Sequence, residues 1–347
     1  MNFLGYKIPG YVIAASCPAT ENIENIMECA ANGAAAIILK SSSSERMFDN
    51  GTRRCFINKM GFWAESSFDR EIMPLGDAIK LTKTAIKSVN IPIIPSVTEL
   101  TIDSDKWVES CLALENAGAS ALQLDFFYLP NLLHDNKFQE KFIHLLKSVT
   151  KSCRVPIMPK LSIGLPAEFS AHMLRLASIE HVSLLDSIRS PAPMGQSHLS
   201  GNGLSVFGTF MLPITRQYTK VLSDAGLSVC AGGGVTNAKD AAELINLGAS
   251  VIQIATDVLL NGFVRFREID SEISKYLSLQ SAEKETQHIR VEIDLSKCVN
   301  CKKCKTQTFC NIIKSSHKEN SECENCGFCS MLCNSGAICK TYVNANI

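Results

Sequence analysis

The chain has 347 residues, of which 46% are hydrophobic and 20% are charged, a balance typical of a soluble globular protein with a large buried core. Its 34 basic and 34 acidic side chains cancel, so the whole chain has no electrostatic footprint for nucleic acid or for an anionic membrane. No signal peptide or long apolar span is visible, which predicts a cytoplasmic protein that needs no membrane and keeps its thiols reduced.

Short apolar runs alternate with amphipathic segments along most of the chain. The runs are apolar on both faces, like parallel strands covered by helices, and comprise residues 11–16, 36–40, 93–97, 121–126, 157–162, 181–185, 227–231 and 250–255. Apolar side chains at three- and four-residue steps predict helices between these strands, at residues 22–32, 105–118, 167–177 and 238–248.

Eight strands that alternate with helices predict an α/β fold of the (β/α)8 TIM barrel type, which places its chemistry at the carboxyl ends of the strands. A doubly wound sheet is the alternative, and it would need a glycine-rich phosphate fingerprint after the first strand. That position reads Ser16-Cys17-Pro18-Ala19. We therefore expect no Rossmann-type dinucleotide site in this chain.

Glycines and lysines follow several of the strands. Gly232-Gly233-Gly234 ends the seventh strand and Ala255-Thr256 ends the eighth, the two positions at which many barrels bind a phosphate. A tight turn without a ligand is the alternative for the glycines. Lys40 and Lys160 close the second and fifth strands. Their position at the expected catalytic face favours a role in the site over a side chain that extends to solvent.

Eight cysteines fall in two runs near the end of the chain. The runs are Cys298, Cys301, Cys304 and Cys310, then Cys323, Cys326, Cys329 and Cys333. Three closely spaced thiolates hold one iron–sulfur cube, and the fourth cysteine of the run ligates the other cube. This spacing predicts one 4Fe–4S cluster on Cys298, Cys301, Cys304 and Cys333 and a second on Cys310, Cys323, Cys326 and Cys329.

Two details differ from the bacterial ferredoxin pattern. Five residues instead of three separate Cys304 from Cys310, and Asn334 stands at the usual proline position, so Cys310 is the least secure ligand. Zinc is the alternative, but zinc does not need a third cysteine at the same step in both runs. We therefore expect a ferredoxin-like domain with two 4Fe–4S clusters at residues 286–347, after a barrel at residues 1–285.

Several of these segments resemble dihydroorotate dehydrogenase. They are residues 12–16, 33–40, 157–162, 208–209, 213–214, 232–234 and 248–253. A barrel followed by an iron–sulfur tail is more specifically similar to the pyrimidine-reducing half of dihydropyrimidine dehydrogenase. The resemblance covers nearly the whole chain.

The resemblance implies an FMN at the mouth of the barrel. Ala14 and Ala15 would lie under its ring, with Lys40 and Lys160 near the polar edge, where a cation stabilises the anionic reduced ring. The residues implied for the ribityl phosphate are Gly208, Gly233, Gly234, Ala255 and Thr256.

The substrate side departs from the family, which holds a flat pyrimidine with asparagine amides. Asp125 and the pair Asp186-Ser187 stand where asparagines are expected, and of the loop after strand four only Pro130-Asn131 survives, shifted by one residue. An ionised aspartate only accepts hydrogen bonds. We therefore expect Asp125, Asn131, Asp186 and Ser187 to contact a small polar substrate rich in N–H or O–H groups. Pairing with a local lysine is the alternative for the aspartates.

The family moves a proton with a cysteine or serine in the loop after strand four, and neither remains here. Tyr128 is therefore the first candidate for the catalytic acid, with Cys17 second and Lys40 beside the ring. For Cys17 a buried structural thiol is the alternative.

These features predict a flavin- and iron–sulfur-dependent oxidoreductase that reduces or oxidises a carbon–carbon bond in a small polar substrate. Electrons would pass between FMN and the two clusters and come from a ferredoxin or from a separate NAD(P)H-oxidising flavoprotein subunit. We also expect a homo-oligomer. Two alternatives stay open: a non-catalytic electron-transfer or scaffold subunit, and a true dihydropyrimidine or dihydroorotate dehydrogenase.

Overall fold

The computed structural model describes residues 1–45, 55–57, 63–65, 72–129, 137–185, 187–190, 204–282, 288–308, 310 and 326–343. The chain divides into two compact units, Met1–Leu277 and Ser278–Ile347. Among the described residues, no helix combines the length and the apolarity needed to cross a bilayer.

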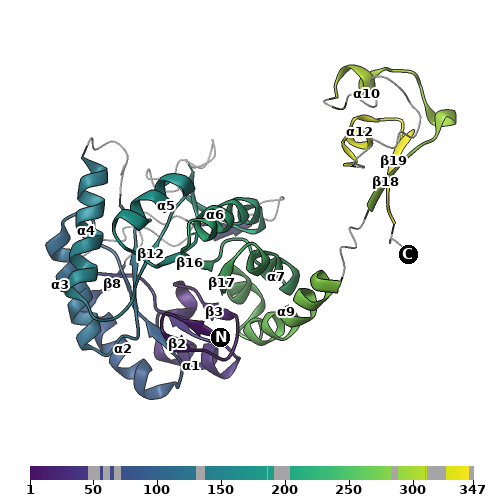
Figure 1. Cartoon of the computed structure of the whole chain (residues 1–347). Helices are drawn as coiled ribbons and strands as arrows, with labels where there is room; N and C mark the ends of the chain where they lie inside the picture. Colours follow the sequence, from purple (N-terminus) through teal and green to yellow (C-terminus); the bar gives the residue numbers. More distant parts are fainter. Residues whose placement is uncertain are drawn as a thin grey trace. The chain divides into compact units, whose positions relative to one another are not determined.

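The first unit is built on a curled, eleven-stranded parallel sheet (Figure 1). Its strands are β3 (Val12–Ala14), β4 (Ile37–Ile38), β5 (Ser42–Ser43), β8 (Met73–Pro74), β9 (Ile93–Ile94), β10 (Ser96–Val97), β11 (Leu122–Asp125), β12 (Ile157–Lys160), β13 (His181–Ser183), β16 (Ser228–Ala231) and β17 (Ala249–Ile254). Each of the eight predicted runs coincides with at least one of these strands, so the strand predictions are confirmed.

The strand pairings follow chain order and return to their start. β17 pairs with β3, β3 with β4, and β4 with β9. After Pro95 the chain continues as β10, which pairs with β11. From β11 the pairings run through β12, β13 and β16 to β17. This succession of neighbouring parallel runs is that of a (β/α)8 barrel, and the α/β prediction is confirmed.

Helices lie outside the sheet and alternate with its strands (Figure 1). They are α1 (Ile23–Ala31), α2 (Leu75–Ser88), α3 (Ser104–Asn116), α4 (Phe138–Ser152), α5 (Ala167–Leu176), α6 (Leu212–Asp224), α7 (Ala238–Asn246), α8 (Thr256–Asn261) and α9 (Arg265–Ala282). Asn22 and Asn237 cap α1 and α7 by accepting a hydrogen bond from a backbone N–H of the first turn. The four segments predicted as helices correspond to α1, α3, α5 and α7.

Two layers of apolar side chains hold the barrel together. The larger cluster packs the helices onto the sheet and includes the fully buried Trp107, Phe142 and Phe266. The smaller cluster contains strand residues together with Phe3, Leu4 and Ile8 of the N-terminal hairpin β1 (Asn2–Phe3) and β2 (Tyr6–Lys7). The polar chemistry of the unit is therefore left to the carboxyl ends of the strands.

A separate antiparallel sheet extends two of the connections between strand and helix. Its order is β14 (Ile188–Ser190), β15 (Leu204–Phe207), β7 (Trp63–Glu65) and β6 (Cys55–Ile57). The alternation of the barrel did not predict this sheet, because it belongs to the loops and not to the repeat. It brings β15 beside the carboxyl ends of the barrel strands.

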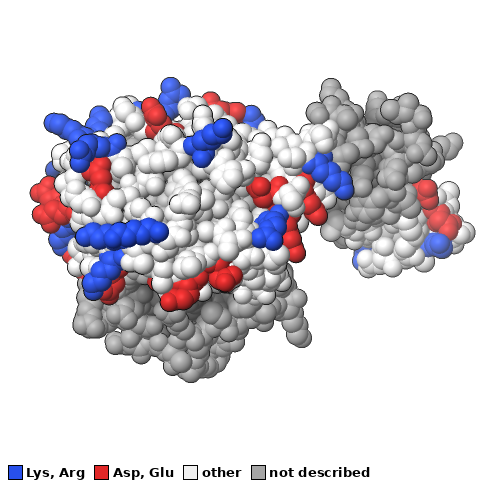
Figure 2. All heavy atoms as spheres, turned by 90° about the horizontal axis from the view of Figure 1, so that it is seen from below, with Lys and Arg blue, Asp and Glu red and all other residues white. Residues whose placement is uncertain are grey.

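Both signs of charge are mixed on the surface of the first unit. On the face in Figure 2, Lys and Arg side chains lie among Asp and Glu side chains over its described part. Such a mixture is consistent with the formal net charge of +0, and on this face it creates no field of a single sign.

The second unit contains a two-stranded antiparallel ribbon, β18 (His288–Ile293) and β19 (Ile338–Val343). Two short helices, α10 (Lys303–Thr306) and α12 (Phe328–Leu332), lie between these strands in the sequence. Its small core contains Cys329 and Ile338, with Cys304, Cys310 and Cys333 packed against them. Cysteines thus make up much of the described interior of this unit.

Candidate active site

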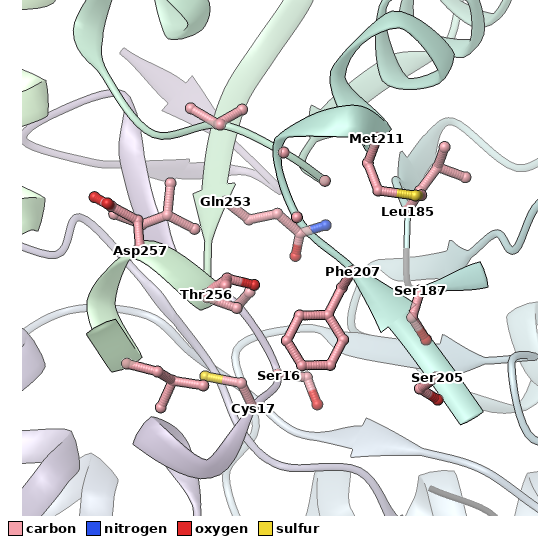
Figure 3. A pocket seen from close by; sticks show the side chains of 18 of the residues that line it. Ser16, Cys17, Leu185, Ser187, Ser205, Phe207, Met211, Gln253, Thr256 and Asp257 are labelled. Atoms are coloured by element: carbon pink, nitrogen blue, oxygen red, sulfur yellow. The ribbon is translucent and has the colours of Figure 1, made fainter. Parts of the chain in front are cut away.

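A cavity of about 190 Å³ lies at the carboxyl ends of the barrel strands (Figure 3). Lys40 follows β4, Tyr128 follows β11, and Lys160 ends β12. Gly234 follows β16 and Thr256 follows β17. These are the positions from which a (β/α)8 barrel presents its functional side chains.

Most of the residues predicted for the site line this cavity. They are Ala15, Cys17, Lys40, Tyr128, Lys160, Ser187, Gly208, Gly233, Gly234, Ala255 and Thr256. Ala14 is 1% exposed and, like Asp125, is not on the cavity wall. Asn131 and Asp186 lie outside the described residues. The structure therefore brings the expected cofactor residues together and leaves those two substrate assignments as predictions.

The glycine loop after β16 adopts a backbone that requires glycine. Gly233 and Gly234 have φ angles of +105° and +88°, which other residues rarely adopt. A Cβ on Gly234 would lie 2.7 Å from the backbone nitrogen of Leu212 and 3.0 Å from the carbonyl oxygen of Gly208. Thr215 braces the loop, because its hydroxyl lies 2.8 Å from the carbonyl oxygen of Gly233, to which it donates.

This loop has the donor set that a phosphate needs. Among the described residues, no acceptor bonds the backbone N–H groups of Gly233, Gly234 and Val235. Consecutive N–H groups in such a turn form a concavity that binds anions. The missing Cβ atoms let the loop pack closely against Thr215, Leu212 and Gly208, which holds the backbone in this turn. The residues present therefore fit a phosphate group at the predicted position.

Asp125 forms a buried ion pair with Lys160. Its Oδ2 lies 3.7 Å from the ammonium of Lys160, and the two side chains are 1% and 6% exposed. The same oxygen accepts a hydrogen bond of 2.7 Å from the hydroxyl of Ser41, and Oδ1 accepts one of 3.1 Å from the backbone N–H of Phe127. The contacts described for this carboxylate are thus internal and fit the lysine-pairing alternative, and the substrate contact of Asp125 stays a prediction.

A chain of hydroxyls leads from the Asp125 carboxylate to the cavity. Because Ser41 gives its one proton to Asp125, its oxygen accepts from Ser16 at 3.2 Å and from Ser96 at 3.0 Å. Ser96 in turn accepts from the amide of Gln123 at 2.9 Å. Ser16 lines the cavity. With its proton directed at Ser41, Ser16 offers the cavity an acceptor.

Lys40 and Tyr128 meet at the cavity wall. The ammonium of Lys40 lies 3.5 Å from the phenol oxygen of Tyr128, and Lys40 is 7% exposed. The ring of Phe127 packs edge-on against that of Tyr128, with centroids 5.3 Å apart. A cation beside a phenol oxygen favours the phenolate over the phenol, and this contact pairs the predicted acid with one of the predicted flavin lysines.

Three cavity residues stand out among those that were not predicted from the sequence. Phe207 and Ser205 come from β15 in the unpredicted antiparallel sheet, and the Phe207 ring projects into the cavity (Figure 3). Gln253 lies in β17 and is 4% exposed, and its amide nitrogen donates to the hydroxyl of Ser183 at 2.8 Å and to the carbonyl of Leu184. Among the described residues its oxygen has no partner. Its position in an otherwise apolar strand could have identified Gln253 from the sequence as a candidate site residue.

Thiols of the barrel differ in their access to the cavity. Cys17 lines the cavity and is 7% exposed. Burial raises the pKa of Cys29 and of Cys230 to about 12, so both stay neutral and pack as small apolar groups. Among the described cysteines of the barrel, Cys17 is the one that can meet a ligand.

Four cysteines of the second unit line one small cavity: Cys298, Cys301, Cys304 and Cys333. These are the four predicted to share the first cluster. Burial and then the neighbouring Cys301 raise the pKa of Cys304, and Cys333 and Cys298 also contribute. Nevertheless, no group of three or more His, Cys, Asp or Glu in the described part of the chain is arranged to hold a metal ion.

The second predicted cluster is less completely described. Cys326, Cys329 and Cys310 are described, and Cys323 lies outside the described residues. Cys329 is 9% exposed and belongs to the small core against which Cys310 packs. Both ligand sets therefore stay predictions.

The family of the chain follows from comparison with known proteins. The sequence profile of the family described as "Dihydroorotate dehydrogenase" matches residues 1–277. The chain belongs to the dihydroorotate dehydrogenase family. It is accordingly a dihydroorotate dehydrogenase-like flavin oxidoreductase, with the substrate left open.

Relatives in this family carry two kinds of name. "Dihydroorotate dehydrogenase B (NAD(+)), catalytic subunit" of Thermoplasma volcanium is 27% identical, covering 83% of this chain and 96% of its own length. The protein of that name from Pyrococcus abyssi is 30% identical over 40% of this chain and 48% of its own length. "NAD-dependent dihydropyrimidine dehydrogenase subunit PreA" of Escherichia coli strain K12 is 21% identical over 58% of each chain.

Proposed function

We propose that this chain is the catalytic subunit of an oxidoreductase that holds FMN in the barrel cavity and two 4Fe–4S clusters in its second unit. The observation that carries the proposal is the convergence of Lys40, Lys160, Tyr128 and the glycine loop on one cavity at the strand ends. A non-catalytic scaffold would not need two buried lysines beside an anion-binding loop.

Residues already described would hold the flavin. Gly233, Gly234 and Val235 would bind its phosphate through backbone N–H groups, and Ala15 lies on the same cavity wall. When bound, flavin supplies the ability to take up or release two electrons with a substrate. Lys160 would stand at its polar edge with its position fixed by Asp125.

Tyr128 is the proposed proton donor and acceptor. Reduction of a carbon–carbon double bond needs a proton at the second carbon, from a group within hydrogen-bond reach. Tyr128 holds such a proton at its phenol oxygen on the cavity wall. The adjacent ammonium of Lys40 stabilises the phenolate left after transfer. In the reverse direction the phenolate would accept the proton.

A pyrimidine substrate is the second candidate for the reaction, and one observation favours it. An Asp125 carboxylate in contact with the substrate would repel the carbonyl oxygens of a pyrimidine ring, but Asp125 does not line the cavity and is bonded to Lys160 and Ser41. The two relatives from Thermoplasma volcanium and Pyrococcus abyssi are named for dihydroorotate. Orotate, the oxidised partner of dihydroorotate, therefore belongs among the first substrates to test.

Electrons would reach the barrel through the second unit. The proposed ligands are Cys298, Cys301, Cys304 and Cys333 for one cluster and Cys310, Cys323, Cys326 and Cys329 for the other. Two relatives are named as subunits, which supports a separate partner. We propose a ferredoxin or an NAD(P)H-oxidising flavoprotein in that role.

One experiment tests the function directly. Anaerobically purified protein is reduced with dithionite, and the flavin absorbance is followed as orotate, uracil, thymine and a panel of unsaturated polar metabolites are added singly. Reoxidation by one of these compounds is expected. A bound flavin that none of them reoxidises would favour the non-catalytic alternative.

A further inference from the structure

Arg265 connects the loop that follows β16 to helix α8, which follows β17. It is the first residue of α9, and its Nε donates to Oδ2 of Asp257 at 2.6 Å while its Nη2 donates to the carbonyl oxygen of Thr236 at 2.8 Å. Thr236, on the loop after β16, and Asp257, in the first turn of α8, both line the cavity, whereas Arg265 does not. One guanidinium outside the cavity therefore spans both sides of the expected phosphate site.

The bonding partners of Arg265 are held in place from several directions. The side chain of Asp257 is 4% exposed, and its Oδ1 accepts a hydrogen bond of 2.8 Å from Asn261. The third arm of the guanidinium contacts Glu268. Because the donors of a guanidinium lie in a rigid plane, two acceptors that bond to it are kept at a fixed separation. The bridge thus fixes the spacing between the loop after β16 and α8.

We propose that Arg265 is a positioning residue that preorganises the cavity for a phosphate monoester. This inference rests on the proposed function, in which the glycine loop holds the phosphate of FMN. The glycine loop and α8 line the same cavity. If the two were free to separate, ordering them on binding would cost free energy and lower the affinity for the phosphate.

Direct attraction between Arg265 and the phosphate is a less satisfactory explanation. The carboxylates of Asp257 and Glu268 both contact the guanidinium, so they offset its charge. Arg265 also lies off the cavity wall. Its influence on a ligand would therefore pass through Thr236 and Asp257.

The test compares two flavins that differ only in the phosphate. FMN and riboflavin are titrated into the full-length protein after removal of bound flavin, and binding is measured by quenching of flavin fluorescence. In Arg265→Ala the dissociation constant for FMN should rise by about ten- to a hundredfold, as expected for loss of two charge-assisted bonds. The constant for riboflavin, which lacks the phosphate, should change by less than about twofold, within the ordinary scatter of surface substitutions.

Glu268→Ala is the matched control. It removes a contact to the same guanidinium, but Glu268 is 48% exposed and lies in α9, outside both bridged elements, so binding of FMN should be unchanged. If Arg265→Ala does not fold, as judged by its thermal transition, Asp257→Asn serves instead. That variant keeps the shape of the side chain and removes the charge from the bridge, and it should also weaken FMN selectively.

Equal weakening of both flavins, or no weakening of either, would overturn the role of Arg265. Wild-type protein that binds riboflavin as tightly as FMN would overturn it as well, since no phosphate site would then exist. Wild-type protein that binds neither flavin would instead overturn the proposed function on which the inference rests.

Discussion

Asp125 and Lys160 are register partners on the neighbouring strands β11 and β12, and their side chains form an ion pair of 3.7 Å in the interior. The pair places the ammonium of Lys160 at the cavity wall. The carboxylate of Asp125, which lies off the wall, neutralises its charge. A buried charge that loses its partner is costly. Asp125 therefore holds Lys160 in place, whatever ligand the cavity binds.

Removing the carboxylate should destabilise the protein. Asp125→Ala removes a buried carboxylate that pairs with the Lys160 ammonium and accepts from the Ser41 hydroxyl, so the free energy of unfolding should fall by about 3–5 kcal/mol. Urea denaturation of the barrel measures this change. In Lys160→Met the same Asp125 substitution should cost clearly less, and an equal cost in both backgrounds would show that the two charges do not interact.

Gly234 should be essential for retention of FMN. Gly234→Ala places a Cβ 2.7 Å from the backbone nitrogen of Leu212, which displaces the loop whose N–H groups would bind the phosphate. Flavin content after purification measures the effect, and it should fall to near zero. Gly226→Ala is the control, because Gly226 also has a positive φ, +83°, but no atom within 4 Å of the added Cβ. It should lose about 1–2 kcal/mol of stability and keep its flavin.

The fold was largely predictable from the sequence, because each barrel strand carries its own apolar signal. Strands such as Ile157–Lys160 are buried along their whole length, and the repeat of strand and helix fixes the order of the barrel. The partner of Asp125 was less predictable. Both residues were recognised at strand ends, but their contact depends on the register between β11 and β12. Strands that are buried on both faces do not specify that register through their apolar pattern.

Two residues that were missed lie outside the repeat of barrel strands. Phe207 reaches the cavity from an antiparallel sheet outside the barrel repeat. The bridge from Arg265 to Thr236 joins positions 29 residues apart in the chain. A side chain that acts on the site through the backbone of another residue leaves no motif in the sequence.

Tyr128 should matter for turnover and not for binding. In Tyr128→Phe the ring and its packing against Phe127 are kept while the proton is lost. The substrate should therefore reoxidise the dithionite-reduced protein about 10²-fold more slowly or worse, with flavin content unchanged. Stopped-flow absorbance measures the rate. A variant as fast as wild type would exclude Tyr128 as the proton donor and favour Cys17 in that role.

The second unit should contain about eight iron and eight acid-labile sulfide per chain in anaerobic preparations, as expected for two 4Fe–4S clusters. Cys301→Ser should lose one cluster, so that about half of the iron and half of the acid-labile sulfide disappear. Cys339→Ser is the control, since Cys339 is exposed and lies outside both proposed ligand sets. Zinc without sulfide in the wild-type protein would contradict the cluster assignment.

The central claim is that the cavity at the strand ends holds FMN, and the most direct test is to identify the flavin released by heat from anaerobically purified, full-length protein. The account predicts the mononucleotide, at about one per chain, because the cavity offers one loop suited to a phosphate. Release of the dinucleotide, or of no flavin at all, would contradict it.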